Sequence, residues 1–324
     1  SKPRVSMAEN EEEQLKQCKS RIVQLCGKGY FDWCMLDANP HMAGHFLWSF
    51  NDYARGSQEQ TLYCGVVDIN RYPKFCYYML QSMRDATVSQ AGLYNGPMVH
   101  IASYNAGPQF VSSSREITVF SNAEEVRLYR NGHLLGSQTR QERAPLYQPV
   151  VDKGGSPLFV FDAGTYEAGT LKAEAYIGGK VVATHTVSTP GAPHHLKVTL
   201  KTDGIQPVAD GSDMIPVYIE VCDAAGNRVY DAASRIRLQV EGEGMLIGDS
   251  IPRIGINPQQ TEGGVGFAFV RTTRKAGRIT VHATCDGLVA GKASVKTKRA
   301  TLPVLPDGTH PVFGGDEEDG AVQK

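Results

Sequence analysis

Apolar positions in residues 1–90 follow first a helical and then a strand-like pattern. Residues 8–27 place apolar side chains three and four apart, which predicts an amphipathic helix. Residues 44–50 form one short apolar run, which predicts a strand buried on both faces, as in a parallel sheet. A second helix is predicted to open at Pro73, since proline suits a first helical turn, and to run to Met83.

The pattern changes to short alternating runs from about Pro97 onward. Asn131-Gly132 lies between two alternating runs, which is a strong hairpin signal, and Gly178-Gly179 predicts a second hairpin. We therefore expect an antiparallel sandwich over residues 96–190, followed by a linker from Thr189 to Pro193. Its predicted strands are 117–120, 126–129, 133–135, 157–162, 169–177 and 181–187.

A second block of short alternating runs follows the linker. At roughly regular spacing, such runs are typical of another sandwich, expected over residues 191–300. Residues 301–324 combine prolines, glycines and an acidic run, which predicts a surface-lying or disordered tail. The predicted strands of the second block are 196–200, 217–221, 236–240, 265–270 and 279–283.

The parallel-type strand at 44–50 needs parallel neighbours that the rest of the sequence does not predict. We therefore expect residues 1–95 to be the last part of a larger α/β domain, with the remainder of its sheet upstream. The predicted fold is mainly β: two Ig-like β-sandwiches preceded by the last α/β units of a truncated domain.

The balance of charged residues excludes some classes of binding partner. The 324 residues carry 33 basic and 34 acidic side chains, for a net charge of −1. This balance argues against nucleic-acid binding, which needs a basic surface, and against a polybasic membrane anchor. No apolar stretch reaches the ~18–20 residues of a membrane span, and the first residues are not a signal peptide.

Cysteine and histidine positions predict neither a metal site nor a cofactor. No Cys-x-x-Cys pair occurs among the seven cysteines, and His41, His45 and His100 lack zinc-site spacing. The cysteines are expected to be buried free thiols, with a disulfide between Cys222 and Cys285 as the alternative.

Three stretches, in order, resemble glycoside hydrolase family two. Residues 44–53 (GHFLWSFNDY) resemble the eighth strand of its catalytic barrel, and Gly65 to Asp68 with Arg71 to Lys74 resemble the segment after it. Residues 119–132 resemble the sandwich that follows the barrel in many bacterial β-galactosidases of the family. Residues 216–244 resemble an invasin-type Ig-like module.

The resemblance gives the expected domains: a C-terminal remnant of a (β/α)8 catalytic barrel at 1–95, a sandwich at 96–190, an invasin-type Ig-like sandwich at 191–300 and a tail at 301–324. It implies retaining hydrolysis of terminal β-galactosides by two carboxylates about 5–5.5 Å apart. No acidic residue before the eighth strand has the expected setting: Glu9, Glu11, Glu12, Glu13, Asp32 and Asp37. We therefore expect both catalytic glutamates to lie upstream and this chain alone to be inactive.

The resemblance also implies substrate-binding residues at the end of the eighth strand, where barrel active sites lie. Trp48 is expected to form a wall beneath the sugar, with burial in the barrel core as the alternative. Asn51 is expected to bind the substrate. Asp52 is expected to accept hydrogen bonds from sugar hydroxyls or from an arginine that orients the nucleophile, with an ordinary strand-end cap as the alternative. Tyr53 and Arg55 are weaker candidates.

β-Glucuronidases of the family hold the substrate carboxylate with an Asn-x-Lys pair, and Leu62 and Cys64 occupy those positions here. This favours a β-galactoside or related neutral glycan as the substrate. The expected partner is the upstream barrel of the same protein, with a homo-oligomer left open and bacterial export implied by the family. The alternative is a non-catalytic carbohydrate-binding or adhesion protein. The sandwiches contain no tryptophan, which argues against a sugar platform there; its candidate residues are Tyr129, Tyr147, Tyr166 and Tyr176. A third possibility is that the sandwiches are spacers that brace the barrel or help it to dimerise.

Overall fold

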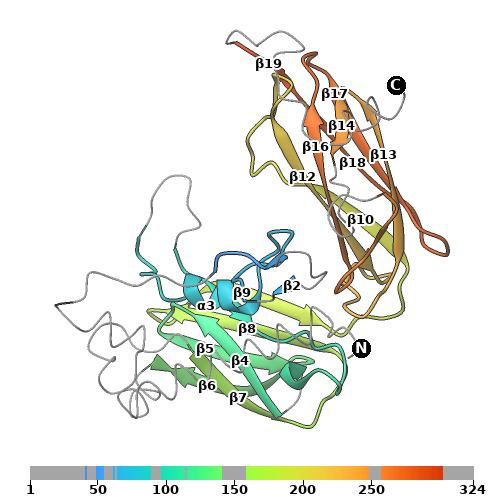
Figure 1. The fold of residues 1–324 in the computed structure, drawn as a ribbon. Coiled ribbons are helices and arrows are strands. Elements are labelled where there is room, and N and C mark those ends of the chain that lie inside the picture. The colour runs from blue at the N-terminus through green and yellow to red at the C-terminus, as the bar shows by residue number, and fades with distance from the viewer. Residues whose placement is uncertain are drawn as a thin grey trace. The chain divides into compact units, whose positions relative to one another are not determined.

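The computed structural model describes residues 41, 49–54, 61–62, 64–88, 96–113, 115–140, 158–247 and 257–301. The chain divides into two compact units, Ser1–Thr189 and Pro190–Lys324 (Figure 1). The division falls at the predicted linker. The predicted helix over 8–27 and the tail lie outside the described residues, and only Ser49 and Phe50 of the 44–50 strand are described.

The first unit begins with short elements and one helix. Strands β1 (Tyr53–Ala54) and β2 (Thr61–Leu62) pair antiparallel, and helix α3 spans Phe75–Gln81. The prediction that the helix opens at Pro73 was wrong by two residues. Pro73 forms an extended bridge with Val67, and the Lys74 N–H donates to the Val66 carbonyl, which keeps these residues out of the helix.

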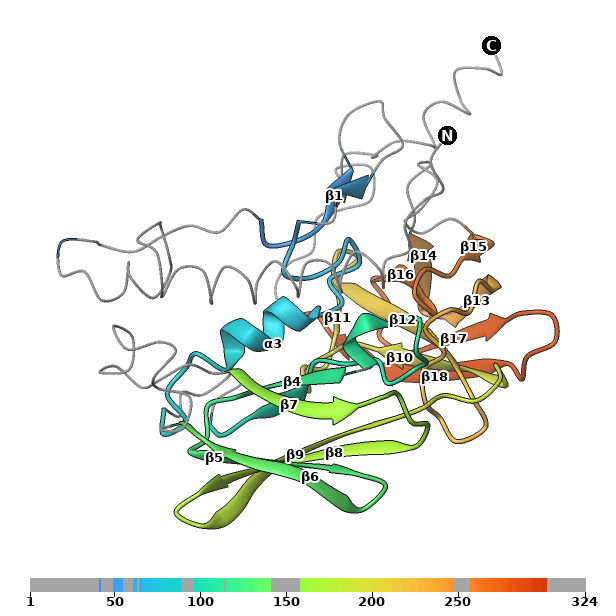
Figure 2. The same cartoon turned by 90° about the horizontal axis from the view of Figure 1, so that it is seen from below.

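Two antiparallel sheets form the first sandwich, as the alternating runs predicted. One sheet has the order β3 (Val99–Ile101), β4 (Arg115–Ser121), β7 (Leu158–Gly164). The other has the order β6 (His133–Thr139), β5 (Glu125–Arg130), β8 (Thr170–Ile177), β9 (Lys180–Ser188). The apolar core lies between the sheets, and the 3₁₀ turn η1 (Val111–Ser113) precedes β4. Figure 2 shows α3 beside the β3–β4–β7 sheet.

Both predicted two-residue hairpins are confirmed. Arg130 pairs with His133 across Asn131-Gly132, and Ile177 pairs with Lys180 across Gly178-Gly179. All four turn residues have φ between 50° and 83°. A turn with both central residues in the left-handed region matches the twist of the strands that it joins.

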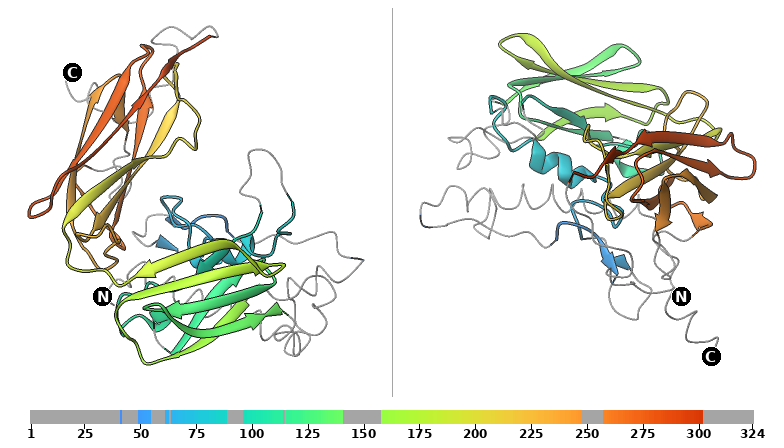
Figure 3. Two further views of the ribbon diagram at one scale, coloured as in Figure 1. Left: turned by 180° about the vertical axis from the view of Figure 1, so that it is seen from behind. Right: turned by 90° about the horizontal axis from the view of Figure 1, so that it is seen from above.

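The second unit is also a sandwich of two four-stranded sheets (Figure 3). The first has the order β10 (His195–Leu200), β12 (Met214–Cys222), β16 (Val265–Thr272), β14 (Gly244–Ile247). The second has the order β15 (Gln259–Gln260), β13 (Arg235–Gly242), β17 (Arg278–Thr284), β18 (Gly291–Lys296). A short parallel pair, β11 (Val208–Ala209) with β19 (Lys298–Arg299), lies apart from both.

Several strands carry too weak an apolar signal to be predicted. β18 faces the core with Gly291, Ala293 and Val295, and its other side chains are polar and exposed. β14 has four residues and β3 has three, which is shorter than the run that establishes a period. These strands could not be predicted from the sequence because they are short or lie at the edge of a sheet.

The cysteines in the described part of the chain are free thiols: Cys64, Cys76, Cys222 and Cys285. The alternative of a Cys222–Cys285 disulfide is thus not realised. Burial raises the pKa of the Cys222 thiol to about 11. Within the described residues, no helix has the length and apolarity needed to cross a membrane.

The core of the first sandwich gives a test of the fold. Leu171 on β8 is fully buried in this core, whereas Thr186 on the neighbouring β9 is exposed. Leu171→Ala should lower the free energy of unfolding by about 2–5 kcal/mol, because it leaves a cavity in a packed core. Thr186→Ala should change it by less than about 0.5 kcal/mol. Urea unfolding followed by circular dichroism measures both, and equal effects would contradict the described core.

Candidate functional site

The segments Ser49–Asp52 and Gly65–Asp68 lie side by side. Asn51 and Val67 form a parallel bridge, in which the Val67 N–H donates to the Phe50 carbonyl and the Asp52 N–H to the Val67 carbonyl, both at 3.0 Å. Two stretches that are not adjacent in the sequence are thus joined as neighbouring parallel strands would be.

Gly65 sits where no side chain fits. A Cβ atom at this position would lie 2.2 Å from the carbonyl carbon of Asn51 and 2.2 Å from the nitrogen of Asp52. This close approach lets the Gly65 N–H donate to Asp52 Oδ1 at 2.8 Å. Glycine is therefore required for contact between the two segments.

A buried ion pair joins the two segments to helix α3. Lys74 Nζ donates to Asp52 Oδ1 at 2.8 Å, with the two side chains 2% and 1% exposed. Lys74 is the N-cap residue of α3. One carboxylate oxygen thus receives hydrogen bonds from both the Gly65 backbone and the Lys74 ammonium. This ties the Ser49–Asp52 segment, the Gly65–Asp68 segment and the start of the helix together.

Asp68 shapes the chain between Gly65 and Lys74. Its Oδ1 accepts from the N–H groups of Asn70, at 2.8 Å, and Tyr72, at 2.7 Å. Arg71 has a φ of 69°, a left-handed conformation that costs energy for a residue other than glycine. The carboxylate holds this tight turn and directs Lys74 back toward Asp52.

The predicted site residues are placed only in part. Trp48 and Arg55 lie outside the described residues. Asn51 is half-buried and donates from Nδ2 to the Asp52 carbonyl at 2.6 Å, and Tyr53 lies in β1. Asp52 is fully buried and directly precedes β1. The substrate-binding roles of Trp48, Asn51 and Asp52 stay predictions.

The sequence does not predict Lys74 as the partner of Asp52. Pro73 and Lys74 predict only the opening of a helix, and Asp52 and Lys74 are 22 residues apart. No local spacing rule links an acid to a lysine that far along the chain. The sequence signal that could predict the pair is a glycine at a position without room for a side chain, here Gly65, with an acid before it and a lysine after it, here Asp52 and Lys74.

An aromatic stack fastens α3 to the first sandwich. The rings of Tyr78 on α3 and His100 on β3 are parallel to within 7°, with centroids 3.5 Å apart. His100 in turn stacks on His185 of β9 at 4.4 Å. His185 Nδ1 accepts from the Ile101 N–H at 3.0 Å, so the neutral ring carries its proton on Nε2.

Both histidines are held in the neutral form. Burial lowers the pKa of His100 well below its ordinary value, and neighbouring His185 lowers it further. Burial also lowers the pKa of His185. Two rings that stack in a desolvated place cannot both be charged without repulsion. Among the described residues, no group of three or more metal-ligating side chains is found.

Comparison with protein families gives two matches. Residues 196–294 match the model described as glycoside hydrolase family 2 C-terminal domain 5. Residues 113–183 match a domain of unknown function. Together these matches cover most of the two sandwiches.

Comparison with curated proteins finds larger relatives. The chain is 34% identical over 275 residues to a β-galactosidase of Thermoanaerobacter pseudethanolicus, covering 80% of this chain and 34% of the relative. It is 29% identical over 287 residues to a β-glucuronidase of Formosa agariphila, covering 85% of this chain and 26% of the relative. The chain thus spans about a quarter to a third of the length of these relatives.

Solved structures share the fold. A β-glycosidase from Bacteroides vulgatus superposes with a TM-score of 0.66 at 21% identity, over 82% of this chain and 32% of that one. A family 2 β-glucuronidase superposes with a TM-score of 0.61 at 26% identity, over 93% of this chain and 29% of that one.

Breaking the buried ion pair should be costly. Lys74→Met leaves a buried carboxylate without its cation, so we expect a loss of about 3–5 kcal/mol in the free energy of unfolding. Asp52→Asn with Lys74→Met should lose markedly less than the sum of the two single changes. Urea unfolding of the four proteins in a double-mutant cycle measures this, and additive losses would contradict the described pair.

The histidine stack should make stability depend on pH. The native state keeps both rings neutral, whereas in the unfolded state they take up protons near pH 6.5. Stability should therefore be complete above about pH 6.5 and fall on acidification, by at most about 1.4 kcal/mol per pH unit for each ring. Thermal unfolding from pH 8 to 5 measures the slope. His100→Phe should reduce it and the exposed-site control His133→Phe should not; equal slopes would contradict the assignment.

Proposed function

Because this chain belongs to glycoside hydrolase family 2, we propose that it is the C-terminal part of a retaining β-galactosidase that hydrolyses terminal β-galactosides. The proposal assigns residues 1–95 to the end of the catalytic barrel and the two sandwiches to accessory domains. The acid/base and the nucleophile are then glutamates of the upstream part, since retaining enzymes need two carboxylates about 5–5.5 Å apart.

The buried contacts of Asp52 are the observation that carries the proposal. Barrel active sites lie at the carboxyl ends of the strands, where side chains must be held in place. Asp52 fixes the end of the segment that follows Trp48 through Gly65 and Lys74, at 2.8 Å each. In this proposal Asp52 is a positioning residue, and Trp48 and Asn51 meet the sugar.

The exposed ring of Phe50 is compatible with a further part of the protein packing against this segment. Phe50 is 62% exposed although the residues on either side of it, Ser49 and Asn51, are half-buried. In the proposed whole protein, the upstream barrel covers this ring.

The side chains before Gly65 support a galactoside over a glucuronide as the substrate. A glucuronide brings a carboxylate, which is held well only by a cationic partner. Neither Leu62 nor Cys64 supplies one, and Cys64 Sγ lies 3.7 Å from Ser49 Oγ. Lys74, the buried lysine nearby, is already bound to Asp52.

A chimaera tests the proposal. This chain replaces the matching C-terminal third of the Thermoanaerobacter β-galactosidase, and hydrolysis of p-nitrophenyl β-galactoside and β-glucuronide is measured. We expect the chimaera to cleave the galactoside and the chain alone to cleave neither substrate. Trp48→Ala should lower kcat/KM at least about tenfold, because the wall beneath the sugar is lost.

Circular dichroism provides the folding control for each chimaera, and Tyr166→Phe on the sandwich provides a matched aromatic change. Turnover by the isolated chain would overturn the assignment of the catalytic glutamates to the upstream part. Preference of a folded chimaera for the glucuronide would overturn the substrate class.

A further inference from the structure

One face of the second sandwich gathers unpaired cations. On the outer face of the β15–β13–β17–β18 sheet, side chains that alternate with the core residues point to solvent. Five of them are exposed lysines or arginines with no ion pair among the described residues: Arg235, Arg237, Arg278, Lys292 and Lys296. Glu241 is the one acid that alternates onto this face within β13, β17 and β18, and its Oε2 lies 3.3 Å from His282 Nε2.

The strand register places like charges opposite each other. Arg278 lies directly across from Lys296. Like charges directly opposite in antiparallel strands destabilise a sheet. Such an arrangement is a cost to the fold unless an anion lies over it.

The other sheet of the same sandwich is arranged differently. On β10, Lys197 lies across from Glu220 and bonds to it at 2.9 Å, and Lys201 pairs with Asp203 at 2.6 Å. The concentration of unpaired positive charge is therefore a property of one face, although the whole chain has a net charge of −1.

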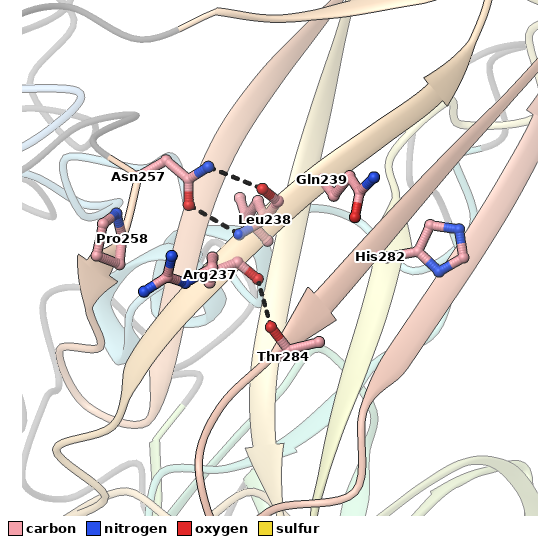
Figure 4. A pocket seen from close by; sticks show the side chains of 7 residues that line it. All are labelled: Arg237, Leu238, Gln239, Asn257, Pro258, His282 and Thr284. Carbon is pink, nitrogen blue, oxygen red and sulfur yellow. Dashed lines mark hydrogen bonds between the residues drawn. The ribbon is translucent and has the colours of Figure 1, made fainter.

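A shallow hollow lies on the basic face. It has a volume of about 250 Å³ and is lined by Arg237, Leu238, Gln239, Asn257, Pro258, His282 and Thr284. Figure 4 shows Arg237 and Pro258 on one side and His282 on the other. Asn257 is fixed by two hydrogen bonds to the Leu238 backbone, at 2.8 and 2.7 Å. The hollow is smaller than the ~300–1,000 Å³ of pockets for drug-sized ligands, so it suits a group of the size of one sugar unit.

We propose that this face binds an acidic polysaccharide, with one carboxylate-bearing sugar in the hollow against Arg237 and the chain continuing along Lys292 and Lys296. A guanidinium and neighbouring hydroxyl and amide groups suit a carboxylate and sugar hydroxyls. Residues two apart along a strand are ~6.6–6.8 Å apart and adjacent strands ~4.8 Å apart, which spreads the charges as a linear polyanion needs.

The side chains on this face favour an acidic glycan over a neutral one. The outward positions of β13, β17 and β18 hold no Trp, Tyr or Phe, so a neutral sugar has no ring on which to stack. The choice of a polysaccharide over other polyanions rests on the proposed function, in which the whole protein acts on glycans. Binding by this face does not depend on hydrolysis.

Affinity electrophoresis in gels containing polygalacturonate tests the inference. The full chain should be retarded by polygalacturonate at low salt, less so above about 0.3 M salt because the attraction is screened, and not by neutral galactan. Arg237→Gln with Lys292→Gln and Lys296→Gln should weaken binding about tenfold, which is about 1.4 kcal/mol over the three charges. The matched control is Lys197→Gln with Lys201→Gln and Arg271→Gln, which should change binding less than twofold.

Three outcomes would overturn the inference: equal weakening by the control, equal retardation by galactan, or tighter binding of single-stranded DNA or of phosphatidylserine vesicles in the same buffer. All substituted side chains are exposed or half-buried, and a circular dichroism melt verifies the fold of each variant. The triple change placed in the galactosidase chimaera should leave hydrolysis of the nitrophenyl galactoside unchanged. Failure of the polysaccharide arm alone therefore leaves the proposed function standing.

Discussion

The contact between Asp52 and Lys74 is the interaction on which the described N-terminal part depends. A carboxylate and an ammonium removed from water gain from each other only if their remaining hydrogen-bonding capacity is met. Here Gly65 supplies a backbone donor at 2.8 Å to the same oxygen. The requirement explains several neighbouring residues at once: a glycine where a Cβ would collide, an Asp68 that closes a turn, and a left-handed Arg71 that the turn demands.

The pair also explains why this part of the chain needs so little regular structure. Between Ser49 and Lys74 the described elements are two strands of two residues, and yet Val66, Val67 and Asp68 are buried. Polar contacts that converge on one carboxylate, together with bridges at Asn51 and Pro73, take the place of a long ladder. A buried ion pair with a defined geometry is a way to specify a conformation where apolar burial alone would not.

Much of the fold could be predicted from the sequence because the strands and hairpins of a sandwich have short-range sequence patterns. The alternation in 126–129 and 217–221 and the turns at Asn131-Gly132 and Gly178-Gly179 fixed strands and hairpins without knowledge of their partners. The site did not follow in the same way. Asp52 was singled out, but its partner Lys74 is specified by tertiary approach, and the stack of Tyr78, His100 and His185 joins three elements with no common period. Local sequence patterns predict strands and turns, which depend on residues close in the sequence. Polar contacts between residues far apart in the sequence have no such local pattern.

The aromatic stack bears on how such proteins can be recombined in evolution. Helix α3 rests its Tyr78 ring on His100 of the first sandwich, and His185 from the opposite sheet stacks on His100. An exchange of modules at residue 95 would separate the stacked rings and leave a desolvated imidazole without its cover. Helix α3 and the first sandwich are therefore expected to be inherited together, whereas exchange of modules is expected at the boundary in the sequence between the two compact units, at Thr189 and Pro190.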